Sequence, residues 1–572
     1  MADPLEAYRA GRTAIPETML AWQLFGAGFE HFGRENAPVR TPTPAPAPDQ
    51  VLLRVDAVGL CFSDVKLIGL GSEHARIAGR DLVANPTVPG HETSMTVVAI
   101  GEKRRDQFRI GDRFIIQADV IHQGVPMAFG YAIPGGMQQF ALVGPEVIEG
   151  DEGNYLLPVK PTTGYAEAAL TEPWACVVAS YRIRPRASFK PGGTACFIGG
   201  RGADFDALHM PSLGPGAAPA TLVASRIRGR FLEILRQEAG RSGARLAERV
   251  VPDVPCDDII FLGVPEPDVL EAAARRLAPG GIICFVGSEP LARPLAVDIG
   301  RIHYDDMIYL GGPGPDILAC YRWPRGKSEL LPDGAAWFIG AAGPMGQMHV
   351  QRAIEQPNGP RTIVATDVDP GRLSALQRRV SGLAGQRGKV LRIVNVAGMR
   401  EEAQNEFLRG ATEGRGFDDI VVLAPVPALV QQAWRYLAEG GFLNIFAGVA
   451  RGTVATLDLS DIYRRGVRVV GSSGSRIADL VDTLADTESG RTSTNISVAA
   501  VGGIQAARDG LQAVKAGSLP GKVVIFPQIG DLPLTPLHEL RERLPSVYAK
   551  LAPGEIWTLD AEDELLRQAL NL

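Results

Sequence analysis

Few cysteines and no long apolar or basic run occur in this chain, and each of these absences excludes a class of protein. No window holds the roughly 18 uninterrupted apolar residues of a membrane-spanning helix. No basic block of the kind that neutralises phosphates stands out, and the net charge is -6, so we expect no nucleic-acid partner. The cysteines lack the paired spacing of a disulfide framework, and most lie in apolar runs typical of buried thiols: Cys61, Cys176, Cys196, Cys256, Cys284 and Cys320.

The first residues, MADPLEAYRAGRTAIP, also lack the charged head and apolar run of a secretory signal. We therefore expect a cytoplasmic protein with no membrane partner. Its 572 residues are too many for one hydrophobic core, so about three or four domains are expected. With 45% hydrophobic and 21% charged residues, the composition is that of an ordinary globular protein.

An internal repeat dominates the middle of the sequence. Residues 256–287 align with residues 417–448, and FIGGRGADFDALHM, from Phe197, echoes FIGAAGPMGQMHV, from Phe338. Each copy alternates short apolar, β-branched runs with segments of helical periodicity, which is typical of parallel strands and crossover helices. The repeat predicts two tandem, doubly wound α/β domains of the Rossmann type, at residues 189–328 and 329–485.

The second copy keeps the pattern of a dinucleotide-binding loop. Gly340, Gly343 and Gly346 follow an apolar strand, and glycines there let the backbone approach a pyrophosphate. Asp367 ends the next strand, where a carboxylate can accept hydrogen bonds from ribose hydroxyls. A carboxylate also repels a 2′-phosphate, so the pattern favours NAD over NADP. The alternative is an α/β domain whose glycines only make a tight turn.

The first copy has lost most of this pattern. Phe205 occupies the position of the third glycine, and an irregular segment replaces the first helix. Ser225 and Arg226 stand where the acid should be; Arg226 could in principle meet a 2′-phosphate, which leaves an NADP interpretation open. We favour a degenerate scaffold domain.

Residues 1–188 show short strands separated by glycine and proline, which predicts a twisted β-barrel. Residues 486–572 are expected to return to this domain and to end in a helix, because DAEDELLRQALNL has acids in its first turn and leucines at helical spacing.

A possible metal site lies in the N-terminal domain. Thiolate, imidazole and carboxylates form a mixed donor set suited to tetrahedral zinc with one open position: Cys61, His91, Glu92 and Glu172. The competing interpretation is a set of ordinary buried residues, and spacing alone does not separate the two.

The motifs GLCFSD, VPGHE, FRIGDRFI and the EP dipeptide, followed by a nicotinamide domain, resemble the zinc-dependent medium-chain alcohol dehydrogenase family. GPMG, TDVDPGRL, GSSGS, PGKVVIFP and the C-terminal tail are similar to its polyol and sugar dehydrogenases, especially L-sorbose-1-phosphate reductase-like proteins. The resemblance implies that residues 1–188 form a GroES-like catalytic domain with a catalytic zinc held by Cys61, His91 and Glu172, and with Glu92 as a ligand or nearby carboxylate. It also implies Ser63 as the proton-relay hydroxyl and Asp64 as the carboxylate that orients the histidine.

The same resemblance implies the residues that bind NAD, namely Gly340, Gly343, Pro344, Met345, Gly346, Asp367, Arg372, Ser472 and Ser473.

The sequence departs from the family in several places. Phe62 and Met95 replace small residues, so we expect altered pocket walls, and the insert at residues 70–87 lengthens the span between Cys61 and His91. No four-cysteine lobe follows, so we expect no structural zinc. Cys176 is an alternative to Glu172 as a ligand.

The expected activity is interconversion of a secondary alcohol and a ketone on a polyol or sugar, with hydride transfer to NAD. A phosphorylated substrate is a weaker expectation, based on the family and on basic residues near the predicted cleft: Lys66, His74, Arg76 and Arg80. Two alternatives stay open, a zinc-free reductase of the same superfamily and a non-enzymatic, NAD-responsive binding protein.

Subunits of this family pair through the edge strands of their nucleotide-binding domains. We therefore predict that residues 190–328 act as an internal pseudo-dimer partner or as an added assembly surface. The chain is still expected to form a homo-oligomer, either a dimer or a tetramer.

Overall fold

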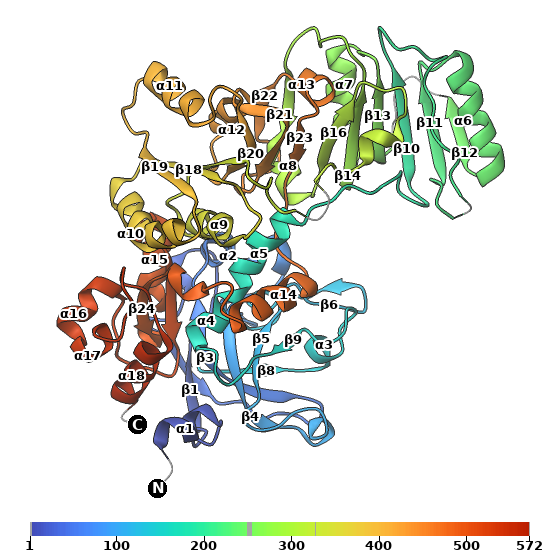
Figure 1. The fold of residues 1–572 in the computed structure, drawn as a ribbon. Coiled ribbons are helices and arrows are strands. Elements are labelled where there is room, and N and C mark those ends of the chain that lie inside the picture. The colour runs from blue at the N-terminus through green and yellow to red at the C-terminus, as the bar shows by residue number, and fades with distance from the viewer. Residues whose placement is uncertain (1–2, 215, 249–253, 326–327, 571–572) are drawn as a thin grey trace.

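An upper body built on one wide sheet and a lower body built on a barrel-like sheet make up the chain in the computed structural model (Figure 1). The structure describes residues 3–214, 216–248, 254–325 and 328–570. Both ends of the chain lie in the lower body, and the repeat forms the upper one (Figure 1). No helix in these described ranges has the length and apolar character that a membrane crossing needs.

The lower body is organised by an eight-stranded sheet, as the strand pattern of the N-terminal domain predicts. Its order is β26-β24-β25-β3-β4-β5-β9, with β8 beside β3. Three of the strands come from the C-terminal part of the chain, so that part returns to the barrel. The bounds are β3 (Val51–Gly59), β4 (Glu92–Ile100), β5 (Arg113–Ile116), β8 (Phe140–Val143), β9 (Leu156–Pro158), β24 (Val498–Gly503), β25 (Lys522–Phe526) and β26 (Thr535–Pro536).

Short strands and helices cover this sheet. The strands are β1 (Thr18–Ala21), β2 (Val39–Pro42), β6 (Ile121–His122) and β7 (Val125–Pro126). The helices are α1 (Pro4–Arg9), α2 (Phe62–Leu70), α3 (Pro145–Ile148), α4 (Tyr165–Ala169), α5 (Thr171–Tyr181), α15 (Ala507–Ala516), α16 (Leu540–Arg543), α17 (Pro545–Tyr548) and α18 (Leu559–Ala569). The predicted C-terminal helix is confirmed as α18, which begins at the cap Thr558 and buries Leu565 and Leu566.

The upper body is one twelve-stranded sheet in which the repeat appears twice. The order is β12-β11-β10-β13-β14-β16 for the first copy, followed by β23-β21-β20-β17-β18-β19 for the second. Within each copy all neighbouring strands are parallel, which confirms two doubly wound domains. The same irregularity recurs in both, between Cys256 and Asp258 and between Phe417 and Asp419.

The strands of the first copy are β10 (Thr194–Gly199), β11 (Thr221–Ser225), β12 (Arg245–Glu248), β13 (Cys256–Leu262), β14 (Leu277–Val286) and β16 (Ile308–Gly312). Those of the second are β17 (Ala335–Ile339), β18 (Thr362–Asp367), β19 (Val390–Asn395), β20 (Phe417–Val422), β21 (Leu437–Ile445) and β23 (Arg468–Val470). The helices of the two copies are α6 (Gly229–Ser242), α7 (Pro267–Ala274), α8 (Ile299–Tyr304), α9 (Pro344–Glu355), α10 (Pro370–Gln386), α11 (Glu401–Ala411), α12 (Pro427–Trp434) and α13 (Ser460–Arg464). Helix α14 (Ile477–Glu488) follows β23 but packs beside α5 in the lower body (Figure 1).

The two copies join edge to edge within one chain. Strand β16 pairs antiparallel with β23 at Tyr309 and Val469, and β15 (Leu295–Asp298) pairs antiparallel with β22 (Val454–Leu457). One hydrophobic core continues across the junction, where the rings of Phe285 and Tyr463 stack. The predicted internal pseudo-dimer is therefore confirmed, and Figure 1 shows its two halves side by side. The domain limits drawn from the sequence stay a proposal.

The first copy differs from the second at the start of its sheet. Helix α9 follows β17, whereas the described residues between β10 and β11 form no helix. Instead this segment buries apolar side chains against the sheet: Phe205, Leu208, Met210 and Leu213. The irregular segment predicted from the sequence is thus confirmed, and it is packed rather than open.

Candidate functional site

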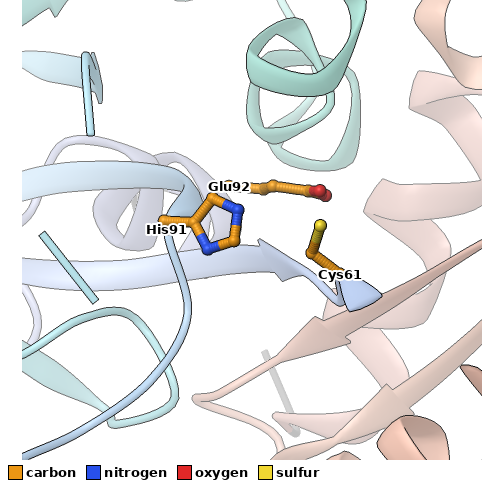
Figure 2. Close-up of side chains that lie close together, drawn as sticks. All are labelled: Cys61, His91 and Glu92. Atoms are coloured by element: carbon orange, nitrogen blue, oxygen red, sulfur yellow. The ribbon is translucent and has the colours of Figure 1, made fainter. Parts of the chain in front are cut away.

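One end of the β3–β4 hairpin gathers the metal-type donors. Cys61 is the cap residue of α2, directly after β3, while His91 and Glu92 begin β4. Gly59 pairs with Glu92 across the two antiparallel strands, so the turn of the chain brings the three side chains together. Their donor atoms all lie within 4.8 Å of one another, and Figure 2 shows the three side chains gathered in one place.

Asp64 holds two of these donors in place. Its carboxylate accepts hydrogen bonds from the backbone N–H of Cys61, at 3.0 Å, and of Gly90, at 3.1 Å. The same carboxylate lies 3.3 Å from Nδ1 of His91. Burial alone would lower the pKa of His91, but the adjacent Asp64 carboxylate raises that pKa well above its ordinary value. This contact turns the imidazole so that Nε2 is left for a ligand.

Lys522, on β25, neutralises the charge of Glu92, the third donor. Its Nζ lies 2.5 Å from Oε1 of Glu92 and donates to the carbonyl oxygen of Leu60 at 3.0 Å. Burial alone would lower the pKa of Lys522, but the Glu92 carboxylate raises it above its ordinary value. The other carboxylate oxygen, Oε2, is buried and has no hydrogen-bond partner. Glu92 therefore keeps one oxygen free to bind a cation.

Glu172 faces this group from the first turn of α5 without joining it. Burial raises the pKa of Glu172 to about 7, with a further upward contribution from Glu92 and a downward one from His91. Its Oε1 lies 3.9 Å from Sγ of Cys176. Within the described residues the compact donor group contains Glu92 instead. The assignment of Glu172 or Cys176 as a ligand stays a prediction.

Three further residues that the sequence analysis singled out near this group differ in their burial. Ser63 is half-buried on α2, two positions beyond Cys61. Phe62 is 50% exposed beside it, so it lies where a pocket wall can differ. Met95 is fully buried among the barrel core residues, such as Val55 and Phe114. The expectation that Met95 lines the pocket was wrong, because its position on β4 turns it toward the core.

The glycine loop of the second copy is shaped as a dinucleotide cradle requires. Gly340 has a left-handed φ of 80°, and a Cβ added at Gly346 would lie 2.6 Å from the carbonyl oxygen of Gly340. Gly343 is the cap residue of α9, and Pro344 is its first residue. Met345 follows and packs against the core of this copy. The backbone N–H groups at the start of α9 are left for a ligand, since its first turn carries no acid.

Asp367 lies at the carboxyl end of β18 and is tied to the loop. Its carboxylate accepts from the backbone N–H of Ala342 at 2.9 Å and of Val368 at 2.7 Å. Arg372, on α10, places a guanidinium nitrogen 3.8 Å from the same carboxylate. The structure therefore brings Asp367 and Arg372 to the side of the glycine loop.

Ser472 and Ser473 follow β23 at the same sheet edge. The Ser472 hydroxyl is buried without a hydrogen-bond partner, and the Ser473 N–H donates to the carboxylate of Asp306 in the first copy.

The matching place in the first copy is filled by its own chain. The Phe205 ring lies 2.6 Å from where a Cβ on Gly199 would be, and Arg228 stacks over that ring at 5.6 Å. Arg226 has a left-handed φ of 57°, and its carbonyl oxygen crowds Gly199 from the other side. These contacts favour the scaffold interpretation over an NADP site.

Helix α8 of the first copy instead contacts the second copy. Nδ1 of His303, on α8, lies 3.3 Å from the carbonyl oxygen of Ile445, at the carboxyl end of β21. The next residue, Tyr304, accepts a hydrogen bond from Nζ of Lys66 on α2, at 3.0 Å. A Cβ on Gly448 would lie only 2.8 Å from the Tyr304 hydroxyl. Three parts of the chain, the barrel and both copies, thus meet at one point.

Lys522 and Tyr304 were not found from the sequence. Lys522 does leave a signal, since it is a lone charge that opens the apolar run VVIF. Tyr304 leaves none, because its neighbours come from two other parts of the chain.

A model of the alcohol dehydrogenase GroES-like domain matches residues 47–149 of the chain. The chain is similar to mannitol-1-phosphate 5-dehydrogenase from Aliivibrio fischeri, at 23% identity over 93% of this chain and 96% of that protein. It is also similar to L-sorbose 1-phosphate reductase from Klebsiella pneumoniae, at 22% identity over 95% of this chain and 97% of that protein. The crystal structure of 2R,3R-butanediol dehydrogenase from Bacillus subtilis shares the fold, with a TM-score of 0.51 at 16% identity, and the match covers 89% of this chain and 99% of that chain.

The chain therefore contains an alcohol dehydrogenase GroES-like domain, is similar along nearly its whole length to two sugar-phosphate dehydrogenases or reductases, and shares the fold of an alcohol dehydrogenase.

Proposed function

We propose that the protein is a zinc- and NAD-dependent dehydrogenase that interconverts a secondary alcohol and a ketone on a polyol or sugar. The observation that carries this proposal is the compact group of Cys61, His91 and Glu92, in a chain that also carries a glycine loop shaped for a dinucleotide. The two curated relatives support the polyol and sugar class, because each is named for such a substrate.

The donor set fits zinc. A thiolate, an imidazole and a carboxylate are ligands that zinc accepts together, and three protein ligands leave a position open for substrate. Glu92 has an unpartnered buried oxygen, and Asp64 fixes the orientation of His91. The chemistry that zinc supplies in such a site is Lewis-acid polarisation of an alcohol or ketone oxygen.

The surrounding residues would prepare and support that chemistry. Asp64 holds the Cys61 backbone and the His91 ring, and Lys522 keeps Glu92 from carrying an unpaired buried charge. Ser63, on the first turn of α2, would accept the proton of the substrate hydroxyl at Oγ and pass it toward solvent. Glu172, which faces the group from α5, would serve as a further ligand or as a carboxylate next to the ligands.

The second copy would hold the cofactor. The pyrophosphate would lie along Gly340, Gly343 and Gly346 at the start of α9, with Pro344 and Met345 shaping the turn. Asp367 would receive the adenosine ribose, with Arg372 at its side, and its charge favours NAD over NADP. Ser472 and Ser473, at the end of β23, would flank the nicotinamide half. The chemistry that NAD supplies is acceptance of a hydride from the carbinol carbon.

The test compares two cysteine variants. The Cys61→Ala protein is expected to lose its bound zinc, measured by atomic absorption, and its NAD-dependent oxidation of polyols falls at least about 100-fold. Cys176→Ala is the matched control, since this thiol also lies near Glu172 but outside the donor group. Undiminished turnover by Cys61→Ala, or full activity of wild-type protein after chelation, contradicts the zinc proposal. Loss of zinc in Cys176→Ala contradicts the ligand assignment.

A further inference from the structure

The insert between Cys61 and His91 lies beside the metal group. It covers residues 70–87 and contains two short 3-10 turns, η2 (Gly71–Glu73) and η3 (Ala75–Ile77). Arg76 lies on η3, and its side chain is 41% exposed. The insert thus presents a guanidinium to solvent close to the residues that the metal would use.

An aromatic ring links Arg76 to the metal group. The Arg76 guanidinium carbon lies 4.8 Å from the centre of the Tyr131 ring, and that ring lies 5.9 Å from the centre of the His91 ring. A single side chain therefore separates the guanidinium from a proposed zinc ligand.

Asp119 links Arg76 to the segment that follows Ser473. The guanidinium lies 2.6 Å from Oδ1 of Asp119, whose side chain is itself 43% exposed. The other oxygen of Asp119 lies 3.2 Å from where a Cβ on Gly474 would be, in the segment that follows Ser473. Asp119 also raises the pKa of Glu172. The Arg76–Asp119 pair therefore lies between the metal group and the proposed nicotinamide end.

Arg76 differs from the other basic residues that the sequence indicated. Arg80 donates to the backbone carbonyls of Asn85, Ala132 and Pro86, so it braces the insert. Burial lowers the pKa of His74, as do Arg76 and Lys66, so this ring is neutral near neutral pH. Lys66 donates to Tyr304. The Arg76 guanidinium pairs with Asp119, and an exposed guanidinium has further donors to offer.

We propose that Arg76 is the specificity-determining residue for a phosphorylated substrate, and that it binds the phosphate of a polyol or sugar phosphate. The guanidinium fork matches two phosphate oxygens, and a phosphate carries more negative charge than the Asp119 carboxylate with which it competes. The inference rests on the proposed dehydrogenase function, since the reacting carbon must lie at the metal group while the phosphate lies at Arg76.

The kinetic test uses mannitol and mannitol 1-phosphate with the zinc-loaded enzyme and NAD. Replacing Arg76 with Met is expected to lower kcat/KM for mannitol 1-phosphate about 10- to 100-fold, the usual effect of losing a hydrogen bond to a charged group. Activity on mannitol should stay within about 3-fold, and Arg76→Lys should recover part of the loss. Arg40→Met removes an exposed charge elsewhere in the barrel and is the control. Equal losses on both substrates, or no loss on either, overturn the proposal.

Asp119→Asn separates phosphate binding from hydroxyl binding. If Arg76 binds phosphate, removing the competing carboxylate should keep or raise kcat/KM for mannitol 1-phosphate. A loss on mannitol and mannitol 1-phosphate alike would instead assign the pair to sugar hydroxyls and contradict the proposal.

A binding measurement decides the case if neither compound is turned over. Calorimetric titration of the zinc- and NAD-loaded protein with mannitol 1-phosphate, and then with inorganic phosphate, should give weaker binding for Arg76→Met than for wild type. Equal binding by the two proteins refutes the role of Arg76. Absence of turnover with either compound would count only against the polyol and sugar substrate class.

Discussion

Lys522 and Glu92 form an ion pair of 2.5 Å in the interior of the barrel, and their side chains are 4% and 0% exposed. The two residues lie 430 positions apart in the chain. Strand β25 carries Lys522 to the end of β3, where Glu92 begins β4. The C-terminal return of the chain therefore balances the charge of a proposed metal ligand.

The first prediction concerns this pair. Lys522→Met should lower the free energy of unfolding by about 3 kcal/mol, because it leaves the Glu92 carboxylate buried without a partner. Urea denaturation followed by circular dichroism measures the change. Lys550→Met is the control, since Lys550 pairs with Glu564 at 2.7 Å on the surface, where such a pair contributes less than about 1 kcal/mol. Equal effects of the two substitutions would show that burial of the Glu92 pair has no energetic consequence.

The second prediction concerns cofactor choice. Asp367→Asn should reduce the preference for NAD over NADP by about 10- to 100-fold in kcat/KM, because the amide keeps an acceptor for the Ala342 N–H but no longer repels a 2′-phosphate. Steady-state kinetics with both cofactors measure this ratio. Asp369→Asn is the control, since Asp369 caps α10 and asparagine caps equally well. An unchanged ratio in Asp367→Asn argues against the placement of the ribose at this carboxylate.

The third prediction concerns the point where the first copy meets the site. Tyr304→Phe should weaken NAD binding about 5-fold, because Lys66 loses the hydroxyl that holds it beside Gly448, at the carboxyl end of β21 where cofactors bind. Because Tyr304 acts through Lys66, the double variant with Lys66→Met should bind NAD no more weakly than Lys66→Met alone. Fluorescence titration of NADH measures these affinities.

The control for the third prediction is Tyr463→Phe. Helix α13, which carries Tyr463, follows β22 in the second copy as α8 follows β15 in the first. Tyr463 donates to the carbonyl oxygen of Glu289, on the side of the filled first copy. NADH affinity should be unchanged in this variant. Additive losses for Tyr304→Phe and Lys66→Met would mean that the tyrosine does not act through the lysine.

The fourth prediction concerns pH. Burial raises the pKa of Glu562 to about 7, although its carboxyl group accepts hydrogen bonds from the backbone N–H groups of Tyr165 and Ala166. A raised carboxyl pKa means that the folded chain holds a proton that the unfolded chain has released above about pH 4.5. Stability from this group is therefore complete below about pH 4.5 and is lost as the pH rises through about 7.

Glu562→Gln removes this titration. As the pH rises from about 4.5 to about 7, the free energy of unfolding of wild type should fall by about 3 kcal/mol more than that of Glu562→Gln. Urea denaturation across this range measures the difference. Glu542→Gln, an exposed substitution on α16, should follow wild type at every pH. Parallel curves for wild type and Glu562→Gln would mean that Glu562 is ionised in the folded chain throughout.

The fold could be predicted from the sequence because its signals are local and repeated. Residues 256–287 and 417–448 carry the same strand and helix pattern, and they form the same parts of the two halves of the sheet. The absence of the first helix from the first copy could also be predicted, because Phe205 replaces the glycine at which the chain would enter that helix. The barrel followed from the glycine and proline spacing of its short strands, and its GroES-like character followed from the resemblance to the family.

The candidate site could be predicted only in part. Cys61 and Asp64 lie close in sequence, and the antiparallel pairing of β3 with β4 brings His91 to them in spite of the insert. Arg76 was noticed only as a charge near the cleft, because its contacts with Asp119 and Tyr131 depend on how distant loops of the barrel pack. The choice of Glu92 over Glu172 within the compact group depends on the start of α5, whose position no local pattern encodes.

The two sides of the β16–β23 junction can accept mutations independently of each other. Where two identical subunits meet about a two-fold axis, every mutation appears on both sides, so the contact must remain complementary to itself. Here the two sides are encoded separately, and a mutation at Tyr309 leaves Val469 as it was. One half can therefore keep Phe205 and Arg226 packed against Gly199 while it continues to pair with the other half. The expected stoichiometry is one coenzyme for each 61.0 kDa chain, although each chain contains two coenzyme-type folds.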